Sequence, residues 1–320
     1  MMLMINNKTE RKILEKFKNK YLTESKEKRA SVALNNPKTL WINTGTLCNI
    51  TCNNCYIFSS PENDELIYFQ DKFFIKYLEE IKSLNWPIEE IGFTGGEPFL
   101  NKEILIMSER ALKENYKVLI LTNAMQPMQR PGVKKGLRQL HKMYGNKLKL
   151  RVSIDHYKME KHDEVRGKGS FSKTIEGVKW LMQEGIKTSV AGRNIWNIEE
   201  EVSRKGYEQL FSEYNFKIDA YDKNQTVLFP EMDEQNIEVP EITTQCWNIL
   251  GKNPNSIMCS NSRMVVHRKG EEKPKVVACT LLPYEKEFEL GDNLKTSENR
   301  VYLNHPHCAK FCVLGGASCS

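Results

Sequence analysis

The stretch Leu47-Cys-Asn-Ile-Thr-Cys-Asn-Asn-Cys-Tyr56 holds three cysteines, Cys48, Cys52 and Cys55, just after the first predicted strand of the chain. Three clustered thiolates can bind three irons of a four-iron, four-sulfur cluster and leave the fourth iron open, which a reactive site requires. A structural zinc site is the competing interpretation, because zinc normally takes four ligands and the Cys52/Cys55 pair would need a distant partner pair. The triplet therefore predicts a metal site without deciding by itself which metal binds.

The composition favours metal or redox chemistry over disulfides. The 320 residues include nine cysteines, and Met1-Met-Leu-Met4 is followed at once by polar and charged residues instead of the apolar stretch of a secretory signal. No apolar run approaches the roughly 18 residues that cross a bilayer, so we expect a cytoplasmic protein without a membrane partner. Much of the net charge of +6 lies in runs such as 8–29 and 134–149. Solvated helix faces explain these runs better than nucleic-acid binding does.

Short β-rich segments alternate with longer helical patterns from residue 39 onward. Strands are predicted over residues 40–44, 90–94, 116–122, 148–154, 186–191 and 226–229, and helices over 71–84, 101–114, 133–144, 171–184 and 198–211. This alternation predicts an α/β protein with a parallel sheet and right-handed crossovers. The charged stretch 8–34, which has a sparse apolar stripe, predicts one more helix packed on the outside.

Turns whose residues could bind a ligand follow the second, third and fourth predicted strands. Phe93-Thr-Gly-Gly-Glu-Pro98 follows the second strand, and its two glycines let the backbone approach a ligand and expose peptide groups. Leu121-Thr-Asn-Ala124 ends the third strand. Arg151-Val-Ser-Ile-Asp155 ends the fourth, and His162-Asp-Glu-Val-Arg-Gly-Lys-Gly-Ser-Phe171 comes soon after it. Functional residues of such folds cluster at the carboxyl ends of the strands, so we expect these turns and the cysteine triplet to form one site.

The C-x3-C-x2-C spacing and the glycine turn after the second strand resemble the radical S-adenosylmethionine (SAM) superfamily. The later turns resemble its branch that contains the molybdenum-cofactor cyclase and the anaerobic sulfatase-maturating and peptide-modifying enzymes. The resemblance implies a curved, partly open (β/α)6 barrel, a [4Fe-4S] cluster on Cys48, Cys52 and Cys55, and SAM chelated at the open iron. It also implies reductive cleavage of SAM to a 5′-deoxyadenosyl radical, hydrogen abstraction from a substrate, and a reducing partner such as flavodoxin or ferredoxin.

The same resemblance assigns residues that bind SAM. The glycine turn would bind the amino group of the SAM methionine, and Ser153 and Arg166 would contact SAM, with the Arg166 guanidinium on its carboxylate. A surface ion pair is the alternative role for Arg166. The chain departs from the family pattern at Ala124, where members carry glycine, and at Asn54, where members usually carry an aromatic residue beside the adenine; either Asn54 or Tyr56 would then contact the adenine. The complete predicted set is Tyr56, Thr94, Gly95, Gly96, Glu97, Pro98, Asn123, Ser153 and Arg166.

A second group of cysteines lies near the carboxyl end. Cys259 and Cys279 flank an alternating, turn-separated pattern that predicts a β-hairpin, and Cys308 and Cys312 follow at C-x3-C spacing. This group resembles the twitch or SPASM domains of the same branch, and more closely the one-cluster twitch form. The resemblance implies an auxiliary [4Fe-4S] cluster on these four cysteines, and a zinc site built from the same residues is the alternative.

Several other reactive side chains remain as candidates. Asp155, His156 and Tyr157 follow the fourth predicted strand, where we expect them to face the site and relay a proton. Cys246 and Cys319 are surplus to one four-ligand cluster. Each of these two cysteines either replaces a ligand, acts as a catalytic thiol or is buried as a small apolar side chain.

These features divide the chain into an N-terminal helical extension (1–36), a radical SAM (β/α)6 core (37–235) and a small cysteine-rich, twitch- or SPASM-like β-hairpin domain (236–320). We predict an oxidoreductase that carries out a net oxidation of a small metabolite, because the N-terminal helix is too small for the leader-binding domain that peptide-modifying relatives often carry. A peptide-crosslinking or epimerising maturase is the alternative within the superfamily. A zinc-stabilised interaction module without chemistry is the alternative from another class.

Overall fold

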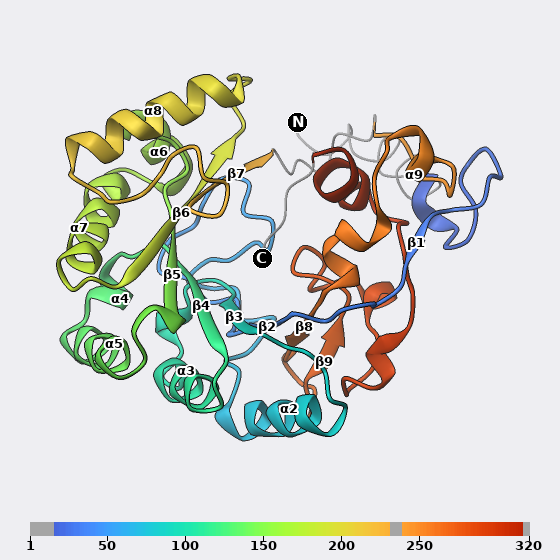
Figure 1. The fold of residues 1–320 in the computed structure, drawn as a ribbon, viewed down its shortest axis with the longest axis horizontal. Helices are drawn as coiled ribbons and strands as arrows, with labels where there is room; N and C mark the ends of the chain where they lie inside the picture. The colour runs from blue at the N-terminus through green and yellow to red at the C-terminus, as the bar shows by residue number, and fades with distance from the viewer. Residues whose placement is uncertain (1–15, 231–238, 316–320) are drawn as a thin grey trace.

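The computed structural model describes residues 16–230 and 239–315. In this part of the chain an eight-stranded sheet has the order β7-β6-β5-β4-β3-β2-β8-β9 (Figure 1). Six of its strands follow one another in sequence and are parallel, which confirms the predicted parallel sheet. They are β2 (Thr39–Asn43), β3 (Glu90–Thr94), β4 (Lys117–Thr122), β5 (Leu148–Ser153), β6 (Lys187–Asn194) and β7 (Thr226–Pro230).

Helices cover the outer face of this curved sheet (Figure 1). The helix α2 is typical, because it buries Phe73, Phe74, Tyr77, Leu78 and Ile81, which form one stripe at helical spacing. The strand β2 is buried along its whole length, as expected for a parallel strand that is covered on both faces. The main covering helices are α2 (Asp71–Ser83), α3 (Ile104–Lys113), α5 (Pro131–Tyr144), α7 (Ser170–Gln183) and α8 (Glu200–Glu213).

The shorter helices were not predicted from the sequence. The helix α6 (Met159–Arg166) buries only His162 and Val165, so it has no strong apolar periodicity to detect. The others are α4 (Gln126–Gln129), α9 (Cys246–Ile249), the 3-10 helices η1 (Pro98–Leu100), η2 (Gly145–Lys147), η3 (Pro254–Ser256), η4 (Met258–Ser260), η5 (Lys286–Phe288) and η6 (Thr296–Glu298), and the π-helix η7 (Cys308–Leu314).

The predicted N-terminal helix over residues 8–34 is wrong beyond Lys18, and its residues 8–15 lie outside the described residues. Asn19 ends the helix, because its side-chain oxygen accepts hydrogen bonds from the N–H groups of Tyr21 and Leu22 and so stabilises a turn. The strand β1 (Ser31–Val32) then pairs antiparallel with β10 (Val301–Tyr302). The N-terminal segment therefore packs against the carboxyl-terminal region, as Figure 1 shows.

The predicted β-hairpin is confirmed as β8 (Ser262–Val266) and β9 (Lys275–Val277), which are antiparallel. The sequence did not predict the place of this hairpin in the fold. Its strand β8 also pairs in parallel with β2 and so extends the main sheet past its first strand. The hairpin and the segments around it enclose a second apolar core, which includes Met264, Val266 and Val277. Among the helices of the described residues, none combines the length and the apolarity that crossing a membrane requires.

Candidate active site

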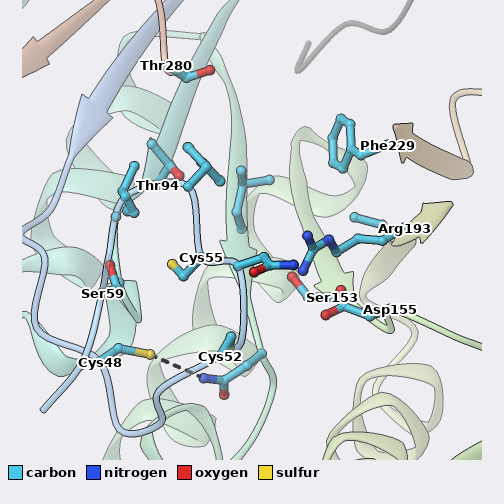
Figure 2. Close-up of a pocket in the computed structure, with 18 of the residues that line it drawn as sticks. Cys48, Cys52, Cys55, Ser59, Thr94, Ser153, Asp155, Arg193, Phe229 and Thr280 are labelled. Atoms are coloured by element: carbon cyan, nitrogen blue, oxygen red, sulfur yellow. Dashed lines mark hydrogen bonds between the residues drawn. The ribbon is translucent and has the colours of Figure 1, made fainter. Parts of the chain in front are cut away.

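A cavity opens where the carboxyl ends of the parallel strands meet, with an empty volume of ≈ 1170 Å³ including its open mouth. In Figure 2, Cys48 and Cys55 lie on one side of this cavity and Ser153, Asp155 and Arg193 on the other. The cavity gathers most of the site residues that the sequence predicts. These are Cys48, Cys52, Cys55, Tyr56, Thr94, Gly95, Gly96, Asn123, Ser153, Asp155 and Arg166.

The loop that carries the cysteine triplet is held by backbone and side-chain hydrogen bonds to distant segments. The N–H of Asn53 donates to the carbonyl of Val165 over 2.8 Å, and its side-chain amide donates to the carbonyl of Glu164 over 2.9 Å. On the opposite side, the hydroxyl of Tyr284 donates to the carbonyl of Ile57 over 2.7 Å. Asn54 lies in the left-handed region at φ 57, which asparagine tolerates better than an aromatic residue does. This conformation gives a local reason for Asn54 at the position where the family usually has an aromatic side chain.

The glycines after β3 allow two loops to touch. A Cβ atom on Gly95, which has φ +139, would clash with the carbonyl oxygen of Gly45, and a Cβ on Gly96 would clash with that of Leu47. The N–H of Gly96 donates to the Gly45 carbonyl over 2.9 Å, and the N–H of Glu97 donates to the Leu47 carbonyl over 3.1 Å. The glycine turn therefore packs closely against the start of the cysteine loop, and these two peptide N–H groups are already used.

Glu97 lies behind the cavity wall instead of lining it, and Pro98 lies there with it. The Glu97 carboxylate accepts hydrogen bonds from the Thr122 hydroxyl at 2.9 Å and from the N–H of Asn123 at 2.9 Å. Burial raises the pKa of Glu97 to about 7, against the lowering effect of these hydrogen bonds. In this structure Glu97 joins the end of β3 to the turn after β4, and its contact with the SAM amino group stays a prediction.

Asn123 reaches from the turn after β4 towards the cysteine loop. Its side-chain amide donates to the Asn49 oxygen over 2.9 Å, and its own oxygen accepts from the N–H of Met125. The next residue, Ala124, is buried in the left-handed region at φ 56, where glycine would be unstrained. This turn rests on α7, because a Cβ atom on Gly177 would clash with the carbonyl oxygen of Ala124.

Arg166 and Asp155 form a two-pronged ion pair at the cavity. Arg166 Nε donates to Asp155 Oδ2 over 2.8 Å, and Nη2 donates to Oδ1 over 3.1 Å. The side chains are 14% and 3% exposed, so this pair is largely buried and is not the surface pair that is the alternative role of Arg166. Burial works against the charge of Arg166, but the Asp155 carboxylate and the nearby Cys52 thiolate raise its pKa overall. Asp155 thus fixes a permanent cation between the cysteine loop and β5.

Comparison with known proteins decides the family. A profile of the radical SAM superfamily matches residues 42–201, half of the chain, including the cysteine loop and the turns after β3 to β5. The chain belongs to the radical SAM superfamily. Its members use a [4Fe-4S] cluster and SAM, and the donor set fits these groups, since all three thiols of the triplet line one cavity with the predicted SAM-binding residues.

The radical SAM chain is similar to three curated proteins. It is 28% identical over 274 residues to the antilisterial bacteriocin subtilosin biosynthesis protein AlbA of Bacillus subtilis (strain 168), which covers 80% of this chain and 57% of AlbA. It is 28% identical to YydG of the same strain, whose name refers to peptide biosynthesis, over 38% of this chain and 36% of YydG. Fe-coproporphyrin III synthase of Methanosarcina barkeri (strain Fusaro / DSM 804) is 30% identical over 48% of this chain and 36% of its own length. The chain thus spans between about a third and 57% of these relatives.

Solved structures confirm the radical SAM fold. SuiB of Streptococcus suis bound to S-adenosylmethionine gives a TM-score of 0.57 at 11% identity, with 88% of this chain and 66% of SuiB covered. The solved structure of native anSMEcpe with bound AdoMet gives a TM-score of 0.56 at 16% identity, with 82% of this chain and 80% of that chain covered. At these identities the likeness concerns the fold alone.

His156 and Tyr157 lie away from the cavity of this radical SAM fold. Their rings stack on each other with centroids 4.1 Å apart, Trp196 packs edge-on against His156, and Tyr157 fills the space beside Gly206 of α8. Burial lowers the pKa of His156 to about 4, so its ring is neutral at neutral pH. We predicted that these two residues face the site, but in the structure they do not, because β5 ends at Ser153 and the chain then turns outward into α6. Only Asp155 of the three reaches the cavity.

Sequence reasoning missed Arg193, which lines the cavity from β6 and donates from Nη1 to the Asn53 carbonyl over 3.2 Å. The predicted strand stopped at residue 191, whereas β6 continues to Asn194, so Arg193 was left outside the set of strand-end residues. Phe229 of β7 and Thr280 and Phe311 of the carboxyl-terminal region were also missed as cavity residues. No local motif marks them, because they approach the cavity only through the tertiary fold.

The carboxyl-terminal cysteines meet at a second cavity. Cys259, Cys279, Cys308 and Cys312 all line it, together with His307 and several apolar side chains. Burial raises the pKa of Cys308, and the neighbouring thiolates of Cys279 and Cys259 raise it further. Within the described residues no three His, Cys, Asp or Glu side chains converge closely enough to share one metal ion. The four cysteines are nevertheless a donor set that fits an iron–sulfur cluster, because each thiolate of a four-iron cluster binds a different iron.

Of the two surplus cysteines, Cys246 and Cys319, the structure describes only the first. Cys246 does not line the second cavity, and its sulfur accepts a hydrogen bond from the N–H of Thr243 at 3.4 Å. Cys319 lies outside the described residues. Leu281, two residues after Cys279, lines both cavities, so the two cavities are adjacent at this residue.

Proposed function

We propose that this chain is a radical SAM enzyme that abstracts a hydrogen atom from a peptide and so takes part in peptide modification. The observation that carries the proposal is the match to AlbA, a bacteriocin biosynthesis protein, over 80% of this chain. The shorter match to YydG points to the same substrate class. These similarities favour the peptide alternative over the small-metabolite oxidation that was predicted from the short N-terminal helix.

The residues of the first cavity would have distinct roles in binding the cluster and SAM. Cys48, Cys52 and Cys55 would hold the cluster, which when bound supplies the electron that cleaves SAM. Arg166 would bind the SAM carboxylate with the part of its guanidinium that the Asp155 pair leaves available. Glu97 would act mainly by fixing the turn that carries Asn123, since its carboxylate accepts from that turn.

The outer part of the first cavity would hold the substrate. Phe229, Leu281 and Phe311 give this part apolar walls, and Thr280 adds a hydroxyl. Figure 2 shows Phe229 and Thr280 on the side of the cavity opposite Cys48 and Cys52. A side chain of a peptide would enter between these walls and present a carbon to the deoxyadenosyl radical, while the wall residues exclude water from it.

The second cavity would hold an auxiliary [4Fe-4S] cluster on Cys259, Cys279, Cys308 and Cys312. Its role would be to accept an electron from the substrate radical or to anchor the substrate. The shared wall at Leu281 supports the electron-accepting role, because it keeps the two cavities adjacent. A zinc site on the same cysteines is the alternative, and it would require the four thiols to move closer together than they lie in this structure. A reducing partner such as flavodoxin or ferredoxin would supply the electron for SAM cleavage.

A small-molecule substrate is the second candidate. It is favoured by the 30% identity to Fe-coproporphyrin III synthase, although that match covers only 48% of this chain. The two substrate classes are distinguished by giving the reduced enzyme SAM with either tetrapyrrole precursors of Fe-coproporphyrin III or a library of short peptides. Peptide-dependent formation of 5′-deoxyadenosine together with a mass change in a peptide would support the proposal, whereas a tetrapyrrole-dependent product without any peptide product would overturn it.

The metal chemistry is tested on anaerobically purified protein by iron, sulfide and zinc analysis with electron paramagnetic resonance. Two clusters require about eight irons in the wild type and about four in a Cys48→Ala/Cys52→Ala/Cys55→Ala variant. SAM should perturb a signal that only the wild type shows. Zinc without sulfide, or no 5′-deoxyadenosine from SAM and dithionite, would refute the enzyme assignment for this chain.

A further inference from the structure

Arg263 is a fully buried arginine whose described hydrogen bonds all go to backbone carbonyls. It lies on β8 and is 0% exposed. Its guanidinium donates to the carbonyls of Ser297 at 2.9 Å, Cys259 at 2.6 Å, Ser262 at 2.8 Å and Asn299 at 3.4 Å. The carbonyls accept four hydrogen bonds from the guanidinium, but they do not cancel its charge.

Three other arginines with largely buried side chains have a carboxylate partner. Arg29 pairs with Glu241, Arg166 with Asp155 and Arg204 with Glu200. Arg263 forms no ion pair with any carboxylate in residues 16–230 and 239–315. A charge that is removed from water without an opposite charge costs several kcal/mol, so a buried arginine is expected to have an anionic partner.

Cys259 and Cys279 flank the hairpin that carries Arg263. Cys259 lies in η4, directly before β8, and its carbonyl is one of the acceptors of Arg263. Cys279 follows β9, and Val277 of β9 pairs with Met264, the residue after Arg263. Both cysteines line the second cavity, and Arg263 Nη1 is bonded to the backbone of one of them. The positive charge is therefore built directly into the wall behind that cavity.

We propose that Arg263 is the counter-charge of an anionic thiolate-ligated centre bound by Cys259, Cys279, Cys308 and Cys312, and that it raises the reduction potential of that centre. This inference rests on the auxiliary cluster proposed above. Four thiolates give a net negative charge to a [4Fe-4S] cluster, and reduction adds one more electron. A fixed cation stabilises the reduced state more than the oxidised state, so the centre becomes a better electron acceptor. Arg263 would act on the centre from behind the ligands, as a positioning and tuning residue.

The test measures the reduction potential of the second centre alone. The Cys48→Ala/Cys52→Ala/Cys55→Ala background removes the first cluster, and redox titration followed by electron paramagnetic resonance reports the remaining one. Arg263→Gln and Arg263→Met remove the charge, and Arg263→Lys keeps it. Arg204→Gln on α8 is the matched control, because it removes a buried arginine that belongs to neither cavity.

We expect both neutral variants to lower the midpoint potential by at least about 59 mV, which is a tenfold change in the equilibrium constant for a one-electron couple. Arg263→Lys should shift it by less than half of this, and Arg204→Gln should leave it unchanged. Unchanged potentials in the neutral variants, or an equal drop in Arg263→Lys, would overturn the proposal. If neither neutral variant folds, a drop of about 59 mV or more in Arg263→Lys, which keeps the charge, would overturn the proposal.

Failure of the underlying auxiliary cluster gives a different result. In that case the triple-cysteine background would contain neither iron nor sulfide. If the triple-cysteine background contains zinc instead, the claim that Arg263 raises a reduction potential is refuted, because zinc has no redox chemistry in proteins. A tenfold weaker zinc affinity of Arg263→Gln, measured by competition with a chelator, would then still support the counter-charge, and an equal affinity would refute that part as well.

Discussion

Phe229 and Phe311 stack with ring centroids 5.6 Å apart and an interplanar angle of 28°. Phe229 is at the end of the last parallel strand and Phe311 is in the π-helix between Cys308 and Cys312, so this contact joins the barrel to the segment that carries two of the auxiliary cysteines. Both rings line the first cavity. A change at either ring therefore alters the first cavity directly and acts on the second through the segment that carries Cys308 and Cys312.

Replacing Phe311 by alanine should destabilise the protein and weaken the second centre. Phe311 is buried, and truncation of a buried phenylalanine costs about 3 kcal/mol because it leaves a cavity. Denaturation in urea measures the change in the free energy of unfolding, and iron analysis measures the metal content. Phe58→Ala is the control, because Phe58 is largely exposed and its loss should change little. Equal stability of Phe311→Ala and Phe58→Ala would contradict the packing role of Phe311.

The Asp155→Asn variant should lower stability by about 3 kcal/mol, because it leaves the buried Arg166 without its counter-charge. It should also weaken SAM binding, since Arg166 would lose its orientation; isothermal titration with SAM measures this. Glu164→Gln breaks the exposed pair with Lys161 in the same helix and serves as the control, with almost no effect on stability. A SAM affinity equal to wild type in Asp155→Asn would show that the pair does not position Arg166.

The Gly177→Ala variant should be strongly destabilised, because the new Cβ would clash with the carbonyl oxygen of Ala124 and displace the turn that holds Asn123. Gly132→Ala in α5 is the matched control, since a Cβ there meets nothing within 4 Å and alanine is favoured in helices by roughly 1 kcal/mol. Thermal unfolding should thus move in opposite directions for the two substitutions. A neutral Gly177→Ala would mean that the turn after β4 can shift without loss.

Stability should fall as the pH rises through the titration of Glu97. Its pKa is raised from 4.5 to about 7 by burial, so the folded protein holds a proton that the unfolded chain has already lost in this range. The contribution is complete below pH 4.5 and is lost as the pH approaches about 7, with a size on the order of 3 kcal/mol. Urea titrations across this range should show a shallower pH dependence in Glu97→Gln than in the wild type. Identical slopes would place the pKa of Glu97 near its ordinary value.

The Cys308→Ser variant should lose the metal of the second cavity while it keeps that of the first, because Cys308 lines the second cavity with the other three cysteines. Cys246→Ser is the control, since its thiol lies outside that cavity and bonds to Thr243. Iron and zinc analysis of both variants gives the result. Metal loss in Cys246→Ser with retention in Cys308→Ser would require a different ligand set.

The barrel was predictable because its signals are local. Strands such as β3 are short buried segments that alternate with amphipathic helices, and Gly185 marks the end of α7 with its φ of 70. The helix α6 lacks such a local signal, because it buries only two of its residues, and so it was not predicted. Asp163 of this helix accepts hydrogen bonds from the N–H groups of Gly169 and Phe171 at the start of α7. In the sequence alone Asp163 resembles an ordinary surface residue.

The sequence by itself determined the superfamily, the parallel sheet and the cysteine groups, because each depends on the spacing of residues that are close in the chain. The tertiary structure decided which side chains face the cavity. It turned Glu97 inward to the Asn123 turn and His156 outward to Trp196, and it brought Phe311 to Phe229. It also attached β8 to β2 and left Arg263 buried beside Cys259. These arrangements result from pairing and packing between segments far apart in sequence, whose free energies no local pattern records.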